Sequence, residues 1–300
     1  MKSSFAAPIT ALVIIVLLYM MSRVPQLPKS EAQQIAKRFS FERIDLPDVG
    51  SLSGTEPKSI RSIHPDLQHF SAWISFVGAA VSLGDLDGDG RSNDMLFVDS
   101  RYDEILVCPV PGTGERYAPF LLSASKLPFD GESTAPMGTL LGDFNEDGRT
   151  DILAYFWGRS PIVFSQVENQ EPSLAAFQES ELVSPRQLWH TSCATQADLD
   201  GDGHFDLIVG NYNPDDAETL NPKASGNEAM MASWARATNG GKSRMFLWSN
   251  GDGEARFTEA ENAMSADVAC GWTFAVGATD MDNDFLPEVY LVHDFGADCF

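Results

Sequence analysis

The chain has 300 residues, 43% of them hydrophobic, which is enough for one large folded domain with its own core. Its formal net charge of −23 argues against a nucleic-acid partner, because phosphate backbones bind surfaces rich in Lys and Arg. Each of four short loops holds four of the 43 acidic residues. Carboxylates gathered in this way repel one another unless a cation lies between them, so they indicate metal binding rather than an evenly solvated acidic surface.

The N-terminus carries an apolar segment. Residues Phe5 to Met21 are uncharged and are flanked by Lys2 and Arg23. A helix of this length spans about 25 Å, the short end of a bilayer span. No A-x-A-like cleavage site follows, so residues 1–22 are predicted to be an uncleaved transmembrane helix, with a cleaved signal peptide and a secreted product as the alternative. Basic residues after the segment favour a cytoplasmic side, but large domains translocate largely regardless of that bias.

Residues 23–70 mix Pro, Ser and charged residues and are predicted to be a tether. Glu31, Ile35 and Phe39 recur every four residues, which favours a short helix, and a disordered stalk is the alternative. From residue 71 onward the sequence repeats itself.

Four copies of one pattern make up the repeat: an apolar strand with small residues, an acidic turn, and a second, fully apolar strand. Four short strands per unit is the plan of a propeller blade, whereas a sandwich would not place the same acidic turn in every unit. The sequence therefore predicts an all-β fold, a partial β-propeller of about three and a half blades over residues 71–300. The copies are FVGAAVSLGDLDGDGRSNDMLFV from Phe76, APMGTLLGDFNEDGRTDILAYF from Ala135, HTSCATQADLDGDGHFDLIVG from His190 and GWTFAVGATDMDNDFLPEVYLV from Gly271.

Two further strands are expected in each of the first three copies, and in the third they flank a hairpin signal at Asn250–Gly253. The third copy also contains an insertion, residues 211–242, with a helix expected around Asn227–Ala237. Such an insertion either serves binding or is a tolerated surface loop. The expected further strands are EILVCPV and YAPFLLS, PIVFSQV and SLAAFQ, and RMFLWSN and ARFTEA.

The acidic turns have the pattern of a calcium loop. In the turn that starts at Asp198, alternate residues carry carboxylates, Gly203 permits the bend, the carbonyl of His204 can turn inward, and Asp206 closes the cage. Ca²⁺ takes six to eight oxygen ligands in loose geometry, and one such turn supplies most of them. In the first copy the closing residue is Asn93 or Asp94. The candidate ligands are Asp85, Asp87, Asp89, Arg91, Asn93 and Asp94; Asp143, Asn145, Asp147, Arg149 and Asp151; Asp198, Asp200, Asp202, His204 and Asp206; and Asp280, Asp282, Asp284, Leu286 and Glu288.

The turns are not EF-hands. An EF-hand needs a bidentate Glu at position twelve and a helix on each side, but position twelve is apolar in all four copies and the flanks are strands. The fourth copy departs from the other three, since Phe285 replaces the glycine of the bend and Glu288 the closing aspartate. We expect it to be the weakest metal site.

These units resemble FG-GAP/VCBS repeats, the blades of the integrin α-subunit propeller, and more closely the bacterial branch of the cartilage acidic protein (ASPIC/UnbV) family. The resemblance is carried by SAWISFVGAAVSLGDLDGDGRSNDMLFVD, PVPGTGERYAPF, APMGTLLGDFNEDGRTDILAYFWGR and NGDGEARFTEA, and it covers about residues 60 to 300. It implies a seven-bladed calcium-binding propeller, extracellular or membrane-attached, used for adhesion or as a scaffold. It also implies that these residues are part of a longer chain.

The predicted function is a binding module without enzymatic activity, stabilised by Ca²⁺ and presenting loops to a protein or glycan. The alternative is a carbohydrate-active enzyme, a polysaccharide lyase or hydrolase, because propellers also host such sites. No nucleophile elbow, H-E-x-x-H motif or Ser/His/Asp pattern supports it. Trp234, in the insertion, is a candidate for stacking on sugar. The four cysteines, Cys108, Cys193, Cys270 and Cys299, have no C-x-x-C spacing, which argues against a zinc site. We expect free thiols, and a disulfide between Cys193 and Cys270, which precede successive acidic turns, is the alternative.

Overall fold

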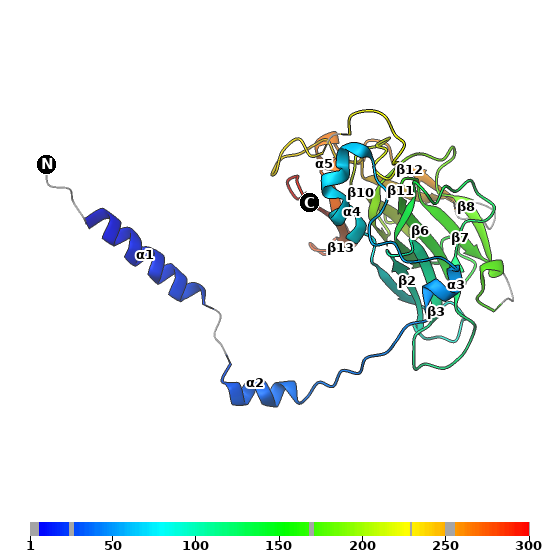
Figure 1. Ribbon diagram of the computed structural model, residues 1–300, viewed down its shortest axis with the longest axis horizontal. Helices are drawn as coiled ribbons and strands as arrows, with labels where there is room; N and C mark the ends of the chain where they lie inside the picture. The colour runs from blue at the N-terminus through cyan, green and yellow to red at the C-terminus, as the bar shows by residue number, and fades with distance from the viewer. Residues whose placement is uncertain (1–5, 24–26, 168–170, 229, 250–255, 300) are drawn as a thin grey trace. The chain divides into compact units, whose positions relative to one another are not determined.

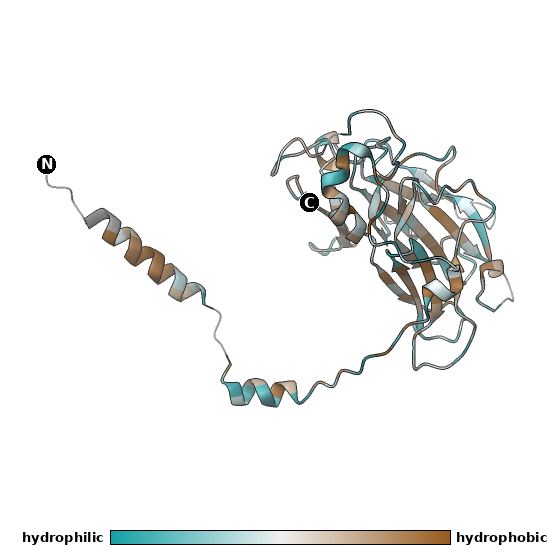
Figure 2. Cartoon of the chain, in the orientation of Figure 1, coloured by the Kyte–Doolittle hydropathy of each residue, from teal (hydrophilic) through white to brown (hydrophobic). Residues whose placement is uncertain are grey.

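The computed structural model describes residues 6–23, 27–167, 171–228, 230–249 and 256–299. The chain divides into two compact units, Met1–Asp45 and Leu46–Phe300. In the first unit, Figure 1 shows two helices, α1 (Ala6–Ser22) and α2 (Lys29–Ala36). Figure 2 shows that α1 is mostly hydrophobic and α2 mostly hydrophilic.

Helix α1 forms where the membrane anchor was expected, but it has only 17 residues. At 1.5 Å per residue it extends about 25 Å, whereas the hydrocarbon core of a bilayer is about 30 Å thick. Among the residues that the structure describes, no helix is both long and apolar enough to cross a membrane. Helix α2 agrees with the short helix expected from Glu31, although it starts two residues earlier and ends at Ala36.

The second unit contains four antiparallel sheets, three with four strands and one with two. Within each sheet the strands follow chain order, so every connection joins neighbours. Each sheet corresponds to one copy of the sequence repeat, which confirms the all-β class. The strands are β1 (Val81–Gly84), β2 (Asp94–Asp99), β3 (Glu104–Pro109) and β4 (Phe120–Leu122); β5 (Ala135–Gly142), β6 (Asp151–Trp157), β7 (Ile162–Gln166) and β8 (Phe177–Glu181); β9 (Thr191–Ala197), β10 (Asp206–Asn211), β11 (Arg244–Ser249) and β12 (Arg256–Glu259); and β13 (Thr273–Thr279) and β14 (Glu288–His293).

The sheets pack face to face in chain order. The core between the first two sheets includes Leu96, Val107, Ile152 and Phe164, and Trp189 with other residues fills the space between the second and third. The first strands β1, β5, β9 and β13 contact one another in series. This arrangement is propeller-like, and Figure 1 shows the strands gathered in the second unit. No strand pairing joins the fourth sheet to the first within the described part of the chain.

The apolar runs of the second strands follow from this packing. Strand β6 is buried along its whole length because the sheet has a neighbour on both faces. The side chains of a strand alternate between faces, so a strand buried on both needs apolar residues at every position. Figure 2 shows the resulting hydrophobic strands in the interior of the unit.

Part of the stretch expected to be a tether packs on the sheets. Helix α3 (Val49–Ser53) and the helical pair η1 (Pro65–Phe70) and α4 (Ser71–Phe76) lie in the second unit. Val49 is buried against Met95, Leu106 and Cys108 on the outer face of the first sheet. The prediction missed this contact because a single buried residue in a short polar helix leaves no periodic pattern.

The insertion runs from β10 to β11 without helix in its described residues, so the helix expected around Asn227–Ala237 is wrong there. Tyr212, Leu220 and Ala237 are buried, and burial of these scattered residues favours an irregular path over an amphipathic helix.

The remaining predictions concern shorter segments. In SLAAFQ, which was expected to be a strand, Leu174–Ala176 form a 3₁₀ turn (η2), and strand β8 begins only at Phe177. The hairpin signal at 250–253 lies outside the described residues. The four cysteines are free thiols.

Candidate metal centres

The four acidic turns occupy the same place in the four sheets. Each joins the first strand to the second, β1 to β2, β5 to β6, β9 to β10 and β13 to β14. We call them loops 1 to 4; they begin at Asp85, Asp143, Asp198 and Asp280. Neighbouring loops touch: Glu146 of loop 2 pairs with His204 of loop 3, and Gly201 of loop 3 lies against Leu286 of loop 4.

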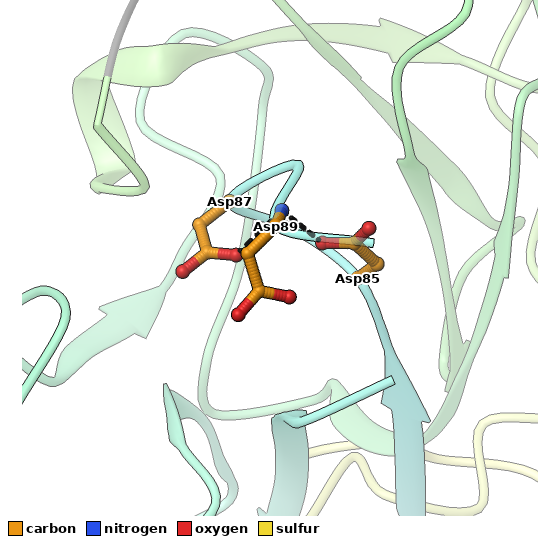
Figure 3. Close-up of side chains that lie close together, drawn as sticks. All are labelled: Asp85, Asp87 and Asp89. Atoms are coloured by element: carbon orange, nitrogen blue, oxygen red, sulfur yellow. Dashed lines mark hydrogen bonds between the residues drawn. The ribbon is translucent and has the colours of Figure 1, made fainter. Parts of the chain in front are cut away.

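The first aspartate of each loop holds the turn together. One of its oxygens accepts a hydrogen bond from the amide five residues later, at 2.8 Å in loops 1 and 2, 3.0 Å in loop 3 and 3.1 Å in loop 4. In loop 1 the amide of Asp89 also donates to Asp85 at 3.1 Å and to Asp87 at 3.2 Å, as Figure 3 shows. These bonds fix the orientation of the Asp85 and Asp87 carboxylates relative to the bend.

The bend needs a left-handed residue at the glycine position. The backbone φ is +83° at Gly90, +85° at Gly148 and +92° at Gly203, and Phe285 takes the same conformation at +76°. This conformation costs a residue with a Cβ about 1–2 kcal/mol, so Phe285 gives loop 4 a backbone strain that the three glycines avoid. A second positive φ, two residues earlier, falls on Gly88, Glu146, Gly201 and Asn283, a requirement that the sequence analysis did not identify.

The closing carboxylate fastens the loop to the sheet. One oxygen accepts from the amide of the loop's second residue, at 2.6 Å for Asp94, 3.1 Å for Asp151, 2.8 Å for Asp206 and 2.6 Å for Glu288. Asp94 is therefore the closing residue of loop 1. Asn93 instead donates to Asp89, at 3.1 Å.

These closing residues are deeply buried in the first three sheets. Asp94 and Asp151 have no exposed surface, and Asp206 is 1% exposed. Burial raises the pKa of Asp151 to about 7, although the amide of Gln166 acts in the opposite direction. Burial likewise raises the pKa of Asp206. A bound cation would oppose both shifts, because it stabilises the charged carboxylate.

Three of the loops gather carboxylates closely enough to hold an ion. Carboxylate oxygens of Asp85, Asp87 and Asp89 lie within 4.8 Å of one another, as do those of Asp198, Asp200 and Asp206, and those of Asp280, Asp282 and Glu288. Two oxygens bound to one Ca²⁺ at about 2.3–2.6 Å can be at most about 5 Å apart, so this spacing fits calcium. The donors are all oxygens, which suits a hard cation.

Loop 2 differs because Asn145 stands where the other loops have an aspartate. Its side chain donates to Asp147 at 2.8 Å, and Arg149 forms an ion pair with the same carboxylate.

The seventh residue of each loop was predicted to offer its backbone carbonyl to the ion. These residues are Arg91, Arg149, His204 and Leu286. The structure places each of them at the end of its turn, where its amide bonds the carboxylate two residues earlier.

Two side chains that the sequence analysis missed contact the loops. Arg116, between β3 and β4, forms ion pairs with Asp87 and Asp94. Burial disfavours its charged form, but its bonds to these two aspartates outweigh that effect and raise its pKa. Glu146 pairs with His204, whose ring stacks on Trp248 at 4.0 Å, and this pairing raises the pKa of the histidine. Both contacts join residues far apart in the sequence, so no local motif reveals them.

Comparison with protein-family models finds no match. The chain is similar to mouse integrin alpha-X, with 28% identity over 156 residues. That similarity covers 45% of this chain but only 13% of the integrin, so the chain spans a small part of its relative's length. The comparison thus shows a partial similarity to one integrin α chain, alongside four antiparallel sheets that repeat one acidic turn.

Proposed function

We propose that this chain is a calcium-binding recognition module whose sheets are blades of an FG-GAP/VCBS-type β-propeller. One observation carries the proposal: the same turn, with the same two sets of hydrogen bonds, recurs between the first two strands of every sheet. Unrelated solvated turns would not repeat both the hydrogen-bonded first aspartate and the closing carboxylate that accepts from the second residue of the loop. The similarity to integrin alpha-X supports an adhesive or recognition role.

Calcium would act on structure rather than on chemistry. Aspartates at positions one, three and five, the carbonyl at position seven and the closing carboxylate would hold the ion, which supplies positive charge to a crowded anionic turn. Loops 2, 3 and 4 touch one another in series, so ions in these loops would stiffen one edge of their sheets. The opposite ends of the sheets, with the insertion, then remain available to a partner.

A protein or a glycan is the class of partner that we propose. Trp234, in the insertion, is 80% exposed and lies edge-on to Phe295, with ring centroids 5.7 Å apart. An exposed indole supported by a second ring is a surface on which a sugar or an apolar side chain can stack. We propose no catalytic role, and we place the module outside the cytoplasm, where calcium concentrations suit weak extracellular sites.

Thermal unfolding of the full chain in EDTA and in Ca²⁺ tests the proposal. A site filled to about a hundred times its Kd adds roughly 2.7 kcal/mol if it binds only the folded state, so calcium should raise the melting temperature clearly. Asp198→Ala should remove part of this gain, whereas Glu261→Ala, which removes an exposed acidic residue outside the loops, should not. Identical melting curves with and without calcium would disprove the calcium role. A glycan and protein array screened with and without EDTA would identify the partner class.

A further inference from the structure

The closing carboxylate of loop 1 is positioned differently from those of loops 3 and 4. Asp206 and Glu288 belong to the groups of oxygens that lie within 4.8 Å of one another. In loop 1 that group contains Asp85, Asp87 and Asp89, but not Asp94. Yet Asp94 accepts the same loop amide as its counterparts, so its place in the chain is equivalent. The difference lies in the partner of its second oxygen, which is a charged side chain in loop 1.

Arg116 holds that second oxygen. Its Nη2 lies 2.6 Å from Asp94 Oδ1 and donates to the carbonyl of Asn93 at 2.7 Å, while the hydroxyl of Tyr117 donates to the same Asp94 oxygen at 3.0 Å. The Nη1 atom of Arg116 bonds Asp87 and lies 4.0 Å from Asp89. One guanidinium thus reaches three carboxylates of a single loop.

In the next two sheets a neutral group takes this position. The corresponding oxygen of Asp151 accepts from the amide of Gln166 at 2.8 Å, and that of Asp206 from the amide of Trp248 at 2.7 Å. A backbone amide fixes the carboxylate but leaves its charge available to a cation. Arginine neutralises it, and it is only 17% exposed at the side chain, so water screens the effect little.

We propose that Arg116 is a built-in counter-cation of loop 1 that competes with calcium, so that loop 1 binds Ca²⁺ more weakly than loop 3. This inference rests on the calcium binding proposed above. An ion held by Asp87 and Asp89 would lie within a few ångströms of the guanidinium, and the two positive charges would repel each other. A cavity of about 450 Å³ lined by Asp87, Arg116 and Arg149 lies beside the loop and gives the side chain room to withdraw when calcium enters.

Calorimetric titration of the full chain with Ca²⁺ tests the inference through Arg116→Met, which keeps the aliphatic length and removes the charge. We expect loop 1 to bind calcium about tenfold more tightly or better, which corresponds to about 1.4 kcal/mol or more, because the variant removes a positive charge that repels the ion. Adding Asp85→Ala should abolish the gain and so assign it to loop 1. Arg101→Met is the matched control, because Arg101 pairs with Asp99, which lies outside the four loops, and its loss changes the net charge equally.

The outcomes separate this inference from the proposed function. A wild-type chain that takes up calcium while Arg116→Met binds it no better than Arg101→Met overturns the inference alone. No uptake by either variant or by the wild type overturns both proposals. Arg116→Lys keeps the charge and should behave nearly as the wild type, and Arg116→Gln, which retains a donor for Asp94, serves the same comparison if Arg116→Met does not fold.

Discussion

At the scale of single residues, the conformation of Phe285 has a measurable consequence. Its side chain is 92% exposed and its φ is +76°, so replacing it by glycine removes strain and little buried surface. We expect Phe285→Gly to stabilise the folded state by about 1 kcal/mol and to tighten calcium binding at loop 4. The converse change, Gly203→Ala, meets no atom within 4 Å, so its expected loss of about 1 kcal/mol reports the backbone alone.

Chemical denaturation of both variants, with and without calcium, checks this prediction. If Phe285→Gly is as stable as the wild type while Gly203→Ala is destabilised, the left-handed position is not limiting in loop 4. The lengthened closing residue Glu288 would then be the cause of any weakness there.

A second residue-scale prediction concerns His190. Its side chain is fully buried and neither ring nitrogen has a hydrogen-bond partner within the described residues. Burial lowers its pKa from the ordinary 6.5 to about 3, so the folded state rejects a proton that the unfolded chain binds. The free energy of unfolding is therefore unaffected by His190 above pH 6.5 and falls by about 5 kcal/mol as the pH drops from 6.5 toward 3, since each pKa unit is worth about 1.4 kcal/mol.

His190→Leu should therefore flatten the fall in melting temperature between neutral and mildly acidic pH. Other groups titrate in the same range, so the comparison needs His69→Leu, which removes an exposed histidine of the same unit. Equal pH dependence in the two variants would mean that His190 gains a partner, such as a buried water, that the protonated ring can use.

At the scale of elements, the sequence predicted the strands well because two signals agreed. The acidic turn marks where each first strand ends, and a fully apolar run such as that of β6 marks a strand with a sheet on either side. The sequence left two candidates for the closing residue of loop 1, Asn93 and Asp94, because this loop is one residue longer than the others and spacing alone does not show where the extra residue lies. The structure identifies Asp94, which is buried and accepts a hydrogen bond from the amide of Leu86.

The elements that sequence could not predict depend on single contacts. Helix α3 has one buried residue, and Arg116 reaches Asp94 across 22 positions of the chain. Neither leaves a period or a motif, because the energy comes from a partner brought in by the fold. The helix predicted in the insertion was wrong for a related reason. The buried residues of the insertion pack against residues from several other elements, so their spacing in the sequence is not helical.

Helix α3 gives a prediction at this scale. Val49 is 3% exposed against the outer face of the first sheet, whereas Leu52 of the same helix is 44% exposed. Val49→Ala should cost about 2 kcal/mol of unfolding free energy through lost burial and a residual cavity. Leu52→Ala should change it by less than about 0.5 kcal/mol. Urea unfolding of both variants measures the difference, and equal small effects would mean that α3 is only loosely attached.

At the scale of the whole molecule, the net charge of −23 must be separated from the calcium sites. A chain so acidic repels itself, and any salt weakens that repulsion, since the screening length falls to about 10 Å at 0.1 M ionic strength. Stabilisation by CaCl₂ alone would therefore not establish specific binding. If the oxygens that converge within 4.8 Å of one another bind calcium as proposed, they would favour a divalent ion over Na⁺ at the same ionic strength.

Melting temperatures in EDTA with NaCl, and in CaCl₂ at the same ionic strength, separate the two effects. NaCl should raise the melting temperature gradually and equally in the wild type and in Asp198→Ala, because removing one charge in 23 hardly changes the overall repulsion. Calcium should give the wild type a larger rise that saturates at low concentration. Asp198→Ala should reduce this rise. Asp280→Ala should reduce it by a smaller amount, because the loop that it affects is already strained. If NaCl matches CaCl₂ at every ionic strength, the acidic turns act as a diffuse negative surface. A larger calcium loss in Asp280→Ala would instead make the fourth loop the strongest site and reverse the order that its backbone predicts.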